Sequence, residues 1–281
     1  MSEPKSALPL ADLQQTLVPI AVAAGAATIH HFSSGDLGID TKNDDSPVTK
    51  ADIDAEAIIL AGLAKAYPDI PVVSEEAAAA GNAPDADALF FLVDPLDGTK
   101  EFISGNGEYT INIALIENGV PIAGVVLAPA KGRIFYGDRE GGARQAAVTD
   151  QTVGDWDDLC IRPAPQDGIT AIASRSHGSS ETSAFLTKMG VENTVKAGSS
   201  LKFCLVACGE ADLYPRFGRT MEWDTAAGDA VLRAAGGLVL CEDGEPLAYG
   251  KQQQATDSDF ANPHFLAIGC GSLKDKISAA R

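Results

Sequence analysis

Cysteine, histidine and aromatic side chains are scarce in this sequence. Among 281 residues there are five cysteines, four histidines and only 6% aromatic residues. The cysteines are scattered, and the two nearest, Cys204 and Cys208, lie four residues apart rather than in a CxxC pair. Because there is no second cysteine pair and no nearby histidine, a cysteine-rich zinc site is excluded and free thiols are expected.

Positive charge is also scarce. The chain has 21 Lys and Arg residues against 39 Asp and Glu residues, so its formal net charge is −18. This balance excludes a broad basic face that would bind a nucleic acid polymer. A small anionic ligand would need local cations in order to approach, and metal ions are one source of them.

Long hydrophobic runs are missing as well. The longest run near the N-terminus, residues 17–29, has 13 residues and is too short to cross a bilayer. The opening segment MSEPKSALPLADLQQ lacks the basic start and cleavable apolar core of a signal peptide. We therefore expect a cytoplasmic protein without a transmembrane segment, and no basic amphipathic face for membrane binding is visible.

The first half of the chain has the pattern of two helices and a largely antiparallel sheet. Apolar residues at helical spacing predict helices over about 10–32 and 51–67. Period-two runs on both sides of Asn118-Gly119 predict a hairpin with a type I′ turn. The biased segment EEAAAAGNAPDADA, which begins at Glu75, is expected to be a mobile loop.

After Asp150 strand and helix patterns alternate, which is typical of an α/β lobe. We therefore predict two lobes. Residues 1–150 would form an N-terminal lobe with an antiparallel sheet, two helices and most of the metal ligands. Residues 151–281 would form an α/β lobe on the ligand-binding side.

Carboxylates stand at three probable strand ends or helix starts: Glu75-Glu76, Asp94 with Asp97, and Asp224. Taken singly, each has an ordinary explanation as a solvated loop, a turn or a helix N-cap. Taken together, they are the hard oxygen ligands that suit Mg²⁺, and the Leu96 carbonyl would add one more oxygen. The sequence therefore predicts a magnesium site.

The residues next to these acids favour a phosphate ligand. Gly98 and Thr99 would open a short helical turn whose free amides hold a phosphate oxygen. The charges of the four acids that would bind metal sum to −4, and two Mg²⁺ ions would neutralise them. A phosphate monoester adds nearly two further negative charges. Four basic residues are candidates for balancing that charge: Lys100, Lys202, Arg216 and Arg219.

Asp52 has two competing interpretations. In the segment TKAD, Thr49 would start a helix and Asp52 would reach back to it as a capping box. Alternatively, Asp52 accepts a hydrogen bond from Thr99, which in turn polarises a metal-bound water. The residues by themselves favour the cap.

At these residues the chain resembles the metal-dependent, lithium-sensitive phosphatases related to inositol monophosphatase. The motifs SEE, DPLDGT and WDTAAG occur in that order, and the resemblance extends from about residue 10 to 270. It implies an α/β fold, namely the layered αβαβα sandwich of the inositol monophosphatase and fructose-1,6-bisphosphatase type, with an α+β N-terminal lobe.

Finer motifs resemble the 3′(2′),5′-bisphosphate nucleotidases of this family. These are DGTKEF, NGEYTINIAL, SRSH, GSSLKFCLVACGEADLYPR and MEWDTAAG. The resemblance implies a Mg²⁺-dependent phosphatase that removes the 3′-phosphate of adenosine 3′,5′-bisphosphate and leaves AMP, in sulfur assimilation and nucleotide recycling. The alternatives are the same chemistry on inositol 1-phosphate or another small phosphomonoester, and a non-catalytic nucleotide or metal sensor.

The resemblance also implies a role for each site residue. One Mg²⁺ would be held by Glu75, Asp94 and the Leu96 carbonyl, a second by Asp94, Asp97 and Asp224, and a weak third would share Glu75. Thr99, oriented by Asp52, would activate the attacking water, while the amides of Gly98 and Thr99 hold the phosphate. Asp224 and four further residues would contact the nucleotide: His177, Ser199, Lys202 and Arg216, with Ser200 as an equal choice for the hydroxyl.

Two further expectations concern partners and one departure from the family pattern. A homodimer and peripheral association with the inner membrane are both compatible with the resemblance. The alanine-rich stretch after Glu75 lacks the polar character of a well-defined catalytic loop, so Glu75 is expected to be a weak or late-forming ligand.

Overall fold

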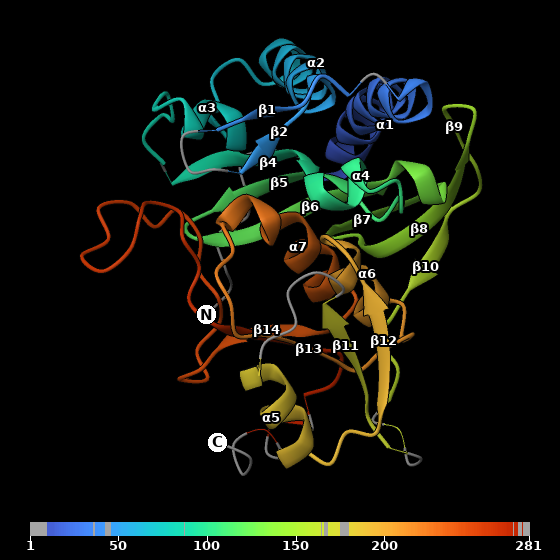
Figure 1. Ribbon diagram of the computed structural model, residues 1–281, viewed down its shortest axis with the longest axis vertical. Coiled ribbons are helices and arrows are strands. Elements are labelled where there is room, and N and C mark those ends of the chain that lie inside the picture. Colours follow the sequence, from blue (N-terminus) through green and yellow to red (C-terminus); the bar gives the residue numbers. More distant parts are fainter. Residues whose placement is uncertain are drawn as a thin grey trace.

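The computed structural model describes residues 10–35, 37–42, 46–86, 88–163, 165, 168–174, 180–271, 273–274 and 277. Its helices and sheets stack in five alternating layers (Figure 1). The predicted layered αβαβα sandwich is therefore confirmed.

The first two layers are a helix pair and a large sheet. Helices α1 (Leu10–Ser34) and α2 (Lys50–Ala66) cover one face of an eight-stranded sheet with the order β10-β8-β7-β6-β5-β4-β3, with β9 paired to β8. The strands are β3 (Val72–Ser74), β4 (Leu89–Asp97), β5 (Thr110–Glu117), β6 (Val120–Ala128), β7 (Arg133–Asp138), β8 (Gly142–Thr149), β9 (Thr152–Val153) and β10 (Asp157–Leu159).

The other three layers follow later in the chain. Helices α6 (Leu201–Ala207) and α7 (Ala226–Ala234) lie between the large sheet and a five-stranded sheet, and α5 (Ser180–Lys188) packs on the far side of the latter (Figure 1). That sheet has the order β12 (Asn193–Ala197), β11 (Thr170–Ser174), β13 (Leu213–Arg216), β15 (Phe265–Ile268), β14 (Leu238–Cys241). The short elements are β1 (Asp40–Thr41), β2 (Pro47–Val48), α3 (Glu75–Ala79), α4 (Thr99–Ile103) and the 3₁₀ turns η1 (Pro129–Lys131) and η2 (Glu222–Asp224).

The large sheet is buried on both faces, and β4 shows how its sequence achieves this. Phe91 and Val93 pack into the core under α1 and α2, whereas Phe90 and Leu92 pack into the core around α6 and α7. Alternate residues of a strand point to opposite faces, so a strand covered on both sides reads as the continuous apolar run LFFLV.

Two glycines let α7 lie directly against the large sheet. A Cβ atom at Gly124 would come within 2.7 Å of the Ala227 carbonyl oxygen, and one at Gly137 within 2.8 Å of the Val231 Cα. Any larger residue would push the helix away from the sheet, because real Cβ contacts are not this short. These contacts fix the distance between α7 and the strands that face it.

Helix α1 is a core helix. Among the described residues it is the one helix long and apolar enough to cross a membrane by length and composition alone, over Asp12–Ser34. However, Leu13, Leu17 and Ala21 are fully or almost fully buried and pack against α2 and the sheet. Its apolar residues thus serve the protein's own core.

The predicted hairpin is confirmed, with positive φ at both Asn118 (51°) and Gly119 (78°) between β5 and β6.

The segment after Ser74 differs from the prediction of a mobile loop. It begins with the short helix α3, and the Ala77 amide donates to the Glu56 carboxylate (3.3 Å). The first sheet also extends beyond Asp150 to Leu159 through β9 and β10. The two-lobe division itself stays a prediction.

Candidate active site

The end of β4 brings two carboxylates to one place. Asp94 pairs with Asn112 of β5 and Asp97 pairs with Thr110, with a register shift between the two pairs. Pro95 has no amide hydrogen to give to the ladder, which favours such an irregularity. The Leu96 amide folds back and donates to Asp94 Oδ1 (2.9 Å). Residues 95–96 thus form a bulge that sets the spacing of the two acids.

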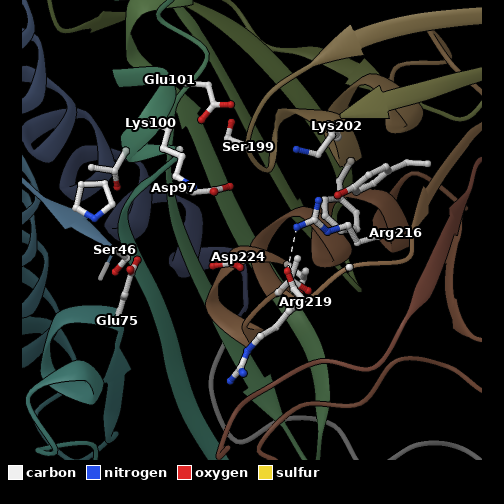
Figure 2. Close-up of a pocket in the computed structure, with 18 residues that line it drawn as sticks. Ser46, Glu75, Asp97, Lys100, Glu101, Ser199, Lys202, Arg216, Arg219 and Asp224 are labelled. Carbon is white, nitrogen blue, oxygen red and sulfur yellow. Dashed lines mark hydrogen bonds between the residues drawn. The ribbon is translucent and has the colours of Figure 1, made fainter. Parts of the chain in front are cut away.

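Asp224 joins this pair from the other half of the chain. It ends the turn η2 just before α7, and its Oδ2 accepts from the Met221 amide (2.8 Å). Carboxylate oxygens of Asp94, Asp97 and Asp224 all lie within 4.8 Å of one another. The structure therefore brings together three of the acids that the sequence proposed as metal ligands. Figure 2 shows Asp97 and Asp224 of this cluster.

The ionised forms of these clustered acids are unfavourable unless a cation binds among them. Burial is the main reason why the pKa of Asp94 lies well above its usual value. The negative charges of Glu75, Asp97 and Asp224 raise it further. Burial and neighbouring carboxylates likewise raise the pKa of Asp224. Asp94 Oδ2 is buried and has no hydrogen-bond partner. A buried, oxygen-only donor set with an unpartnered carboxylate oxygen fits Mg²⁺.

Glu75 lines the same pocket but lies outside the tight acid cluster. The Lys42 ammonium group bonds Glu75 (2.7 Å) and Glu76 (2.6 Å). Burial is the main reason why the pKa of Glu76 is raised to about 7, and the negative charge of Glu75 is the second reason. Lys42 was not among the predicted site residues, because a lysine in the acid-rich loop DTKNDDSPVTK carries no local signal of its partners more than thirty residues later. The assignment of Glu75 as a metal ligand stays a prediction.

Asp52 makes the hydrogen bonds of both interpretations, while its part in activating water stays a prediction. Its Oδ2 accepts hydrogen bonds from the amide (2.8 Å) and the hydroxyl (2.5 Å) of Thr49, which completes the capping box of α2. Its Oδ1 accepts a longer hydrogen bond from the Thr99 hydroxyl (3.4 Å). Capping and contact with Thr99 are thus compatible, because they use different oxygens of one carboxylate.

Gly98 turns the chain from β4 into α4. Its φ is +93°, a left-handed conformation that favours glycine, and a Cβ there would lie 3.2 Å from the Glu108 carbonyl oxygen. Gly98 and Thr99 both line the pocket that contains Asp97 and Asp224. Their role in holding a phosphate stays a prediction.

The opposite wall of this pocket is basic. Figure 2 shows Lys202 and Arg216 facing Asp97 and Asp224 across a cavity of about 510 Å³. Burial lowers the pKa of Lys202 to about 8; the charge of Asp97 opposes this shift, and that of Arg216 adds to it. Arg216 donates through one terminal nitrogen to the Arg219 carbonyl (2.9 Å), while its Nε is buried without a partner.

The geometry favours Ser199 over Ser200 as the hydroxyl that meets a ligand. Ser199 lines the pocket with φ +48°, and its Oγ is buried without a partner. Ser200 is already hydrogen-bonded within the protein. Its Oγ accepts a hydrogen bond from the side-chain Nδ2 of Asn112 (2.9 Å), and it lies close to Asp97 Oδ2 (3.0 Å) and the Asp224 backbone carbonyl (2.5 Å). Ser200 therefore connects metal-ligand candidates from the two halves of the chain.

The remaining candidates are placed as follows. Lys100 lines the pocket beside Glu101. Arg219 lies at the edge of the pocket and bonds Ser258 (2.5 Å) and Asp257 (3.2 Å). His177 lies outside the described residues.

Comparisons with known proteins show the family of this chain. Residues 10–268 match the model of the inositol monophosphatase family. The chain is 46% identical to the 3′(2′),5′-bisphosphate nucleotidase CysQ of Salmonella typhimurium, covering 80% of this chain and 86% of that protein. It is 45% identical to CysQ of Escherichia coli strain K12, covering 82% and 88% respectively.

Solved structures give the same result. CysQ from Bacteroides thetaiotaomicron, described as a bacterial member of the inositol monophosphatase family, superimposes with a TM-score of 0.74 at 35% identity, over 93% of this chain and 99% of that one. An inositol monophosphatase of Thermotoga maritima has the same fold, with a TM-score of 0.75 at 22% identity, over 96% of both chains. This chain belongs to the inositol monophosphatase family.

Proposed function

We propose that this protein is a Mg²⁺-dependent phosphatase that removes the 3′-phosphate of adenosine 3′,5′-bisphosphate, giving AMP and phosphate. The observation that supports it best is that one cavity joins an acidic side to a basic wall. Asp97 and Asp224, which cluster with the buried Asp94, line one side, and Lys202 and Arg216 line the other. Such a site suits a ligand with two phosphates, one at the metal ions and one at the cations. The names of the CysQ relatives support the same substrate.

The residues that would hold metal are Glu75, Asp94, Asp97, Asp224 and the Leu96 carbonyl. Bound Mg²⁺ would supply a Lewis acid that stabilises charge on the attacking and leaving oxygens. Two ions match the charge of the four carboxylates, and a third would share Glu75.

Thr99 and Asp52 would handle the proton of the attacking water. Thr99 Oγ1 donates to Asp52 Oδ1, which leaves the threonine oxygen free to accept a hydrogen bond from water. Burial raises the pKa of Asp52, so that carboxylate is a better proton acceptor than an exposed aspartate. In this proposal Lys202, Arg216 and Ser199 bind the second phosphate and orient the nucleotide.

Phosphate release distinguishes this substrate from the closest alternative. We expect release from adenosine 3′,5′-bisphosphate in Mg²⁺ and none with a chelator, and much slower release from inositol 1-phosphate. Preference for inositol 1-phosphate would support the alternative of an inositol phosphatase and would remove the proposed role of the basic wall. Binding of the nucleotide without hydrolysis in Mg²⁺ would instead indicate a non-catalytic sensor.

The preference for a second phosphate should weaken above pH 8. Because the pKa of Lys202 is lowered to about 8, its ammonium group is protonated below that pH and neutral above it. We expect the kcat/KM of adenosine 3′,5′-bisphosphate, divided by that of adenosine 3′-monophosphate, to fall about tenfold from pH 7 to 9. The ratio cancels the pH dependence of the hydrolytic step, and kcat/KM reports on the free enzyme. A ratio that is constant with pH would contradict this role of Lys202.

Placement and assembly are further proposals. A cytoplasmic location is supported by the packing of α1 as a core helix. A homodimer stays a prediction.

A further inference from the structure

A long loop between β14 and β15 holds the turn that carries Asp224. Residues 249–262, here called the strap, rise from the β14 side of the molecule toward the large sheet and appear as the orange-red loop at the left of Figure 1. At its start, the fully buried Glu222 carboxylate accepts from the amides of Gly250 (2.5 Å) and Lys251 (2.8 Å). The Lys251 ammonium group also pairs with Glu222 (2.7 Å).

The other end of the strap holds the same turn. The Glu222 amide donates to the Phe260 carbonyl (2.8 Å), and Asn262 Nδ2 donates to the Met221 carbonyl (2.8 Å). Met221 in turn donates its amide to Asp224 Oδ2 (2.8 Å). The Asp224 carboxylate is therefore connected to the strap through a short series of hydrogen bonds.

The first part of the strap also reaches the segment that connects α3 to β4. Gln252 Oε1 accepts from the Ala86 amide (2.9 Å), and its Nε2 donates to the Pro84 carbonyl (3.3 Å). Both bonds are to backbone, between α3 and β4. Gly250 (φ +84°) allows this approach, because a Cβ there would lie 3.3 Å from the Phe90 ring.

The two segments joined by Gln252 face each other across a second cavity. This cavity, of about 910 Å³, is lined by α3 residues on one side and by Ser258, Asp259 and Phe260 of the strap on the other. It shares Glu75 and Asp224 with the first cavity, which is lined by Asp97, Lys202 and Arg216. A change in the distance between its walls would change the distance between these two acids.

We propose that Gln252 is a positioning residue for the metal site. Its side chain joins the backbone of the segment between α3, which carries Glu75, and β4 to the strap, which holds Asp224. The inference rests on the proposed function to the extent that Glu75 and Asp224 bind the same group of metal ions. Loss of this contact would weaken metal binding and leave the chemistry at saturating metal unchanged.

The test compares Gln252→Ala with Gln254→Ala. Gln254 is a matched control, since it is similarly half-buried and its side chain also makes two hydrogen bonds to backbone. Both are donated by its Nε2 to carbonyls of the strap itself, Ser258 (2.7 Å) and Ala261 (3.1 Å). Two measurements are made: Mg²⁺ affinity by calorimetry, and hydrogen exchange of the amides of residues 82–86 without metal. Steady-state kinetics with varied Mg²⁺ accompany them.

For Gln252→Ala we expect Mg²⁺ affinity to fall about tenfold, the lower end of the losses seen when an outer contact of a metal ligand is removed, because Gln252 acts through the backbone. Exchange at Ala86 should be at least about tenfold faster, because its amide loses its acceptor, and kcat at saturating Mg²⁺ should stay within about twofold of the wild type. Faster exchange with unchanged Mg²⁺ affinity would overturn the proposal, as would an equal loss in Gln254→Ala. If the wild-type protein binds Mg²⁺ but hydrolyses nothing, the proposed function fails, and the calorimetric comparison still decides the role of Gln252.

Discussion

Asp94→Asn is expected to reduce phosphate release by about a thousandfold or more while the protein stays folded. Asp94 belongs to the acid cluster, is almost fully buried, and has one oxygen without a partner among the described residues. The asparagine keeps the shape of the side chain but removes the charge that would bind metal. Several kcal/mol of charge stabilisation by the metal correspond to a loss of this size.

The same substitution should raise Tm in chelator. In the metal-free protein, burial and neighbouring acids raise the pKa of Asp94, which means that the fold disfavours its ionised form at neutral pH. A neutral side chain removes that unfavourable charge. Mg²⁺ should then raise Tm of the wild type by mass action but have little effect on the variant.

Thermal unfolding with and without Mg²⁺, together with phosphate release, checks both parts of this expectation. Asp243→Asn is the control, because Asp243 is an exposed acid in a turn and bonds only locally, to the Glu245 amide (3.0 Å). Near-normal turnover in Asp94→Asn would show that the metal assignment is wrong. A lower Tm in chelator would show instead that the ionised carboxylate stabilises the metal-free fold.

Lys202→Met is expected to lower kcat/KM for adenosine 3′,5′-bisphosphate about 100-fold. A buried, charge-assisted contact to a phosphate contributes about 3 kcal/mol, because the partner left behind is otherwise unpaired. Methionine is unbranched like the lysine stem, so it keeps packing near the Tyr214 ring, over which the Lys202 ammonium lies at 5.3 Å. The loss should therefore report on charge rather than on a cavity.

The matched substrate for this variant is adenosine 3′-monophosphate, which has the same leaving group and lacks the second phosphate. We expect its kcat/KM to change by less than about threefold. Equal losses on both substrates would mean that Lys202 acts through its neighbour Asp97, whose pKa it helps to lower. In that case the basic wall would serve the metal site and not the nucleotide.

Local sequence patterns predicted most of the fold and part of the site. The hairpin at Asn118-Gly119, the helices α1 and α2 and the layered architecture follow from periodicity, turn chemistry and family motifs. The proximity of Asp94 and Asp97 also follows from three-residue spacing at a strand end. These features depend on residues that are close in sequence.

The contacts that the sequence did not predict join distant segments. Lys42 bonds Glu75 and Glu76, Ser200 contacts Asp97, and Gln252 bonds the backbone at Pro84 and Ala86. Each of these side chains is an ordinary polar residue in its own neighbourhood, and only packing of the layers gives it a partner. The helical start of the EEAAAA segment was missed for a similar reason, because Glu56 of α2 supplies an acceptor for its first turn.

The order of the proposed metal ligands along the chain would have a consequence for synthesis. Asp94 and Asp97 end a strand of the first sheet, but Asp224 follows much later, and the strap that holds its turn comes later still. A nascent chain that has folded its first sheet would present two close acids without the third. It would thus hold metal poorly and hydrolyse nothing until nearly the whole chain has left the ribosome. Premature termination anywhere before the strap would give an inert product rather than an enzyme with altered specificity.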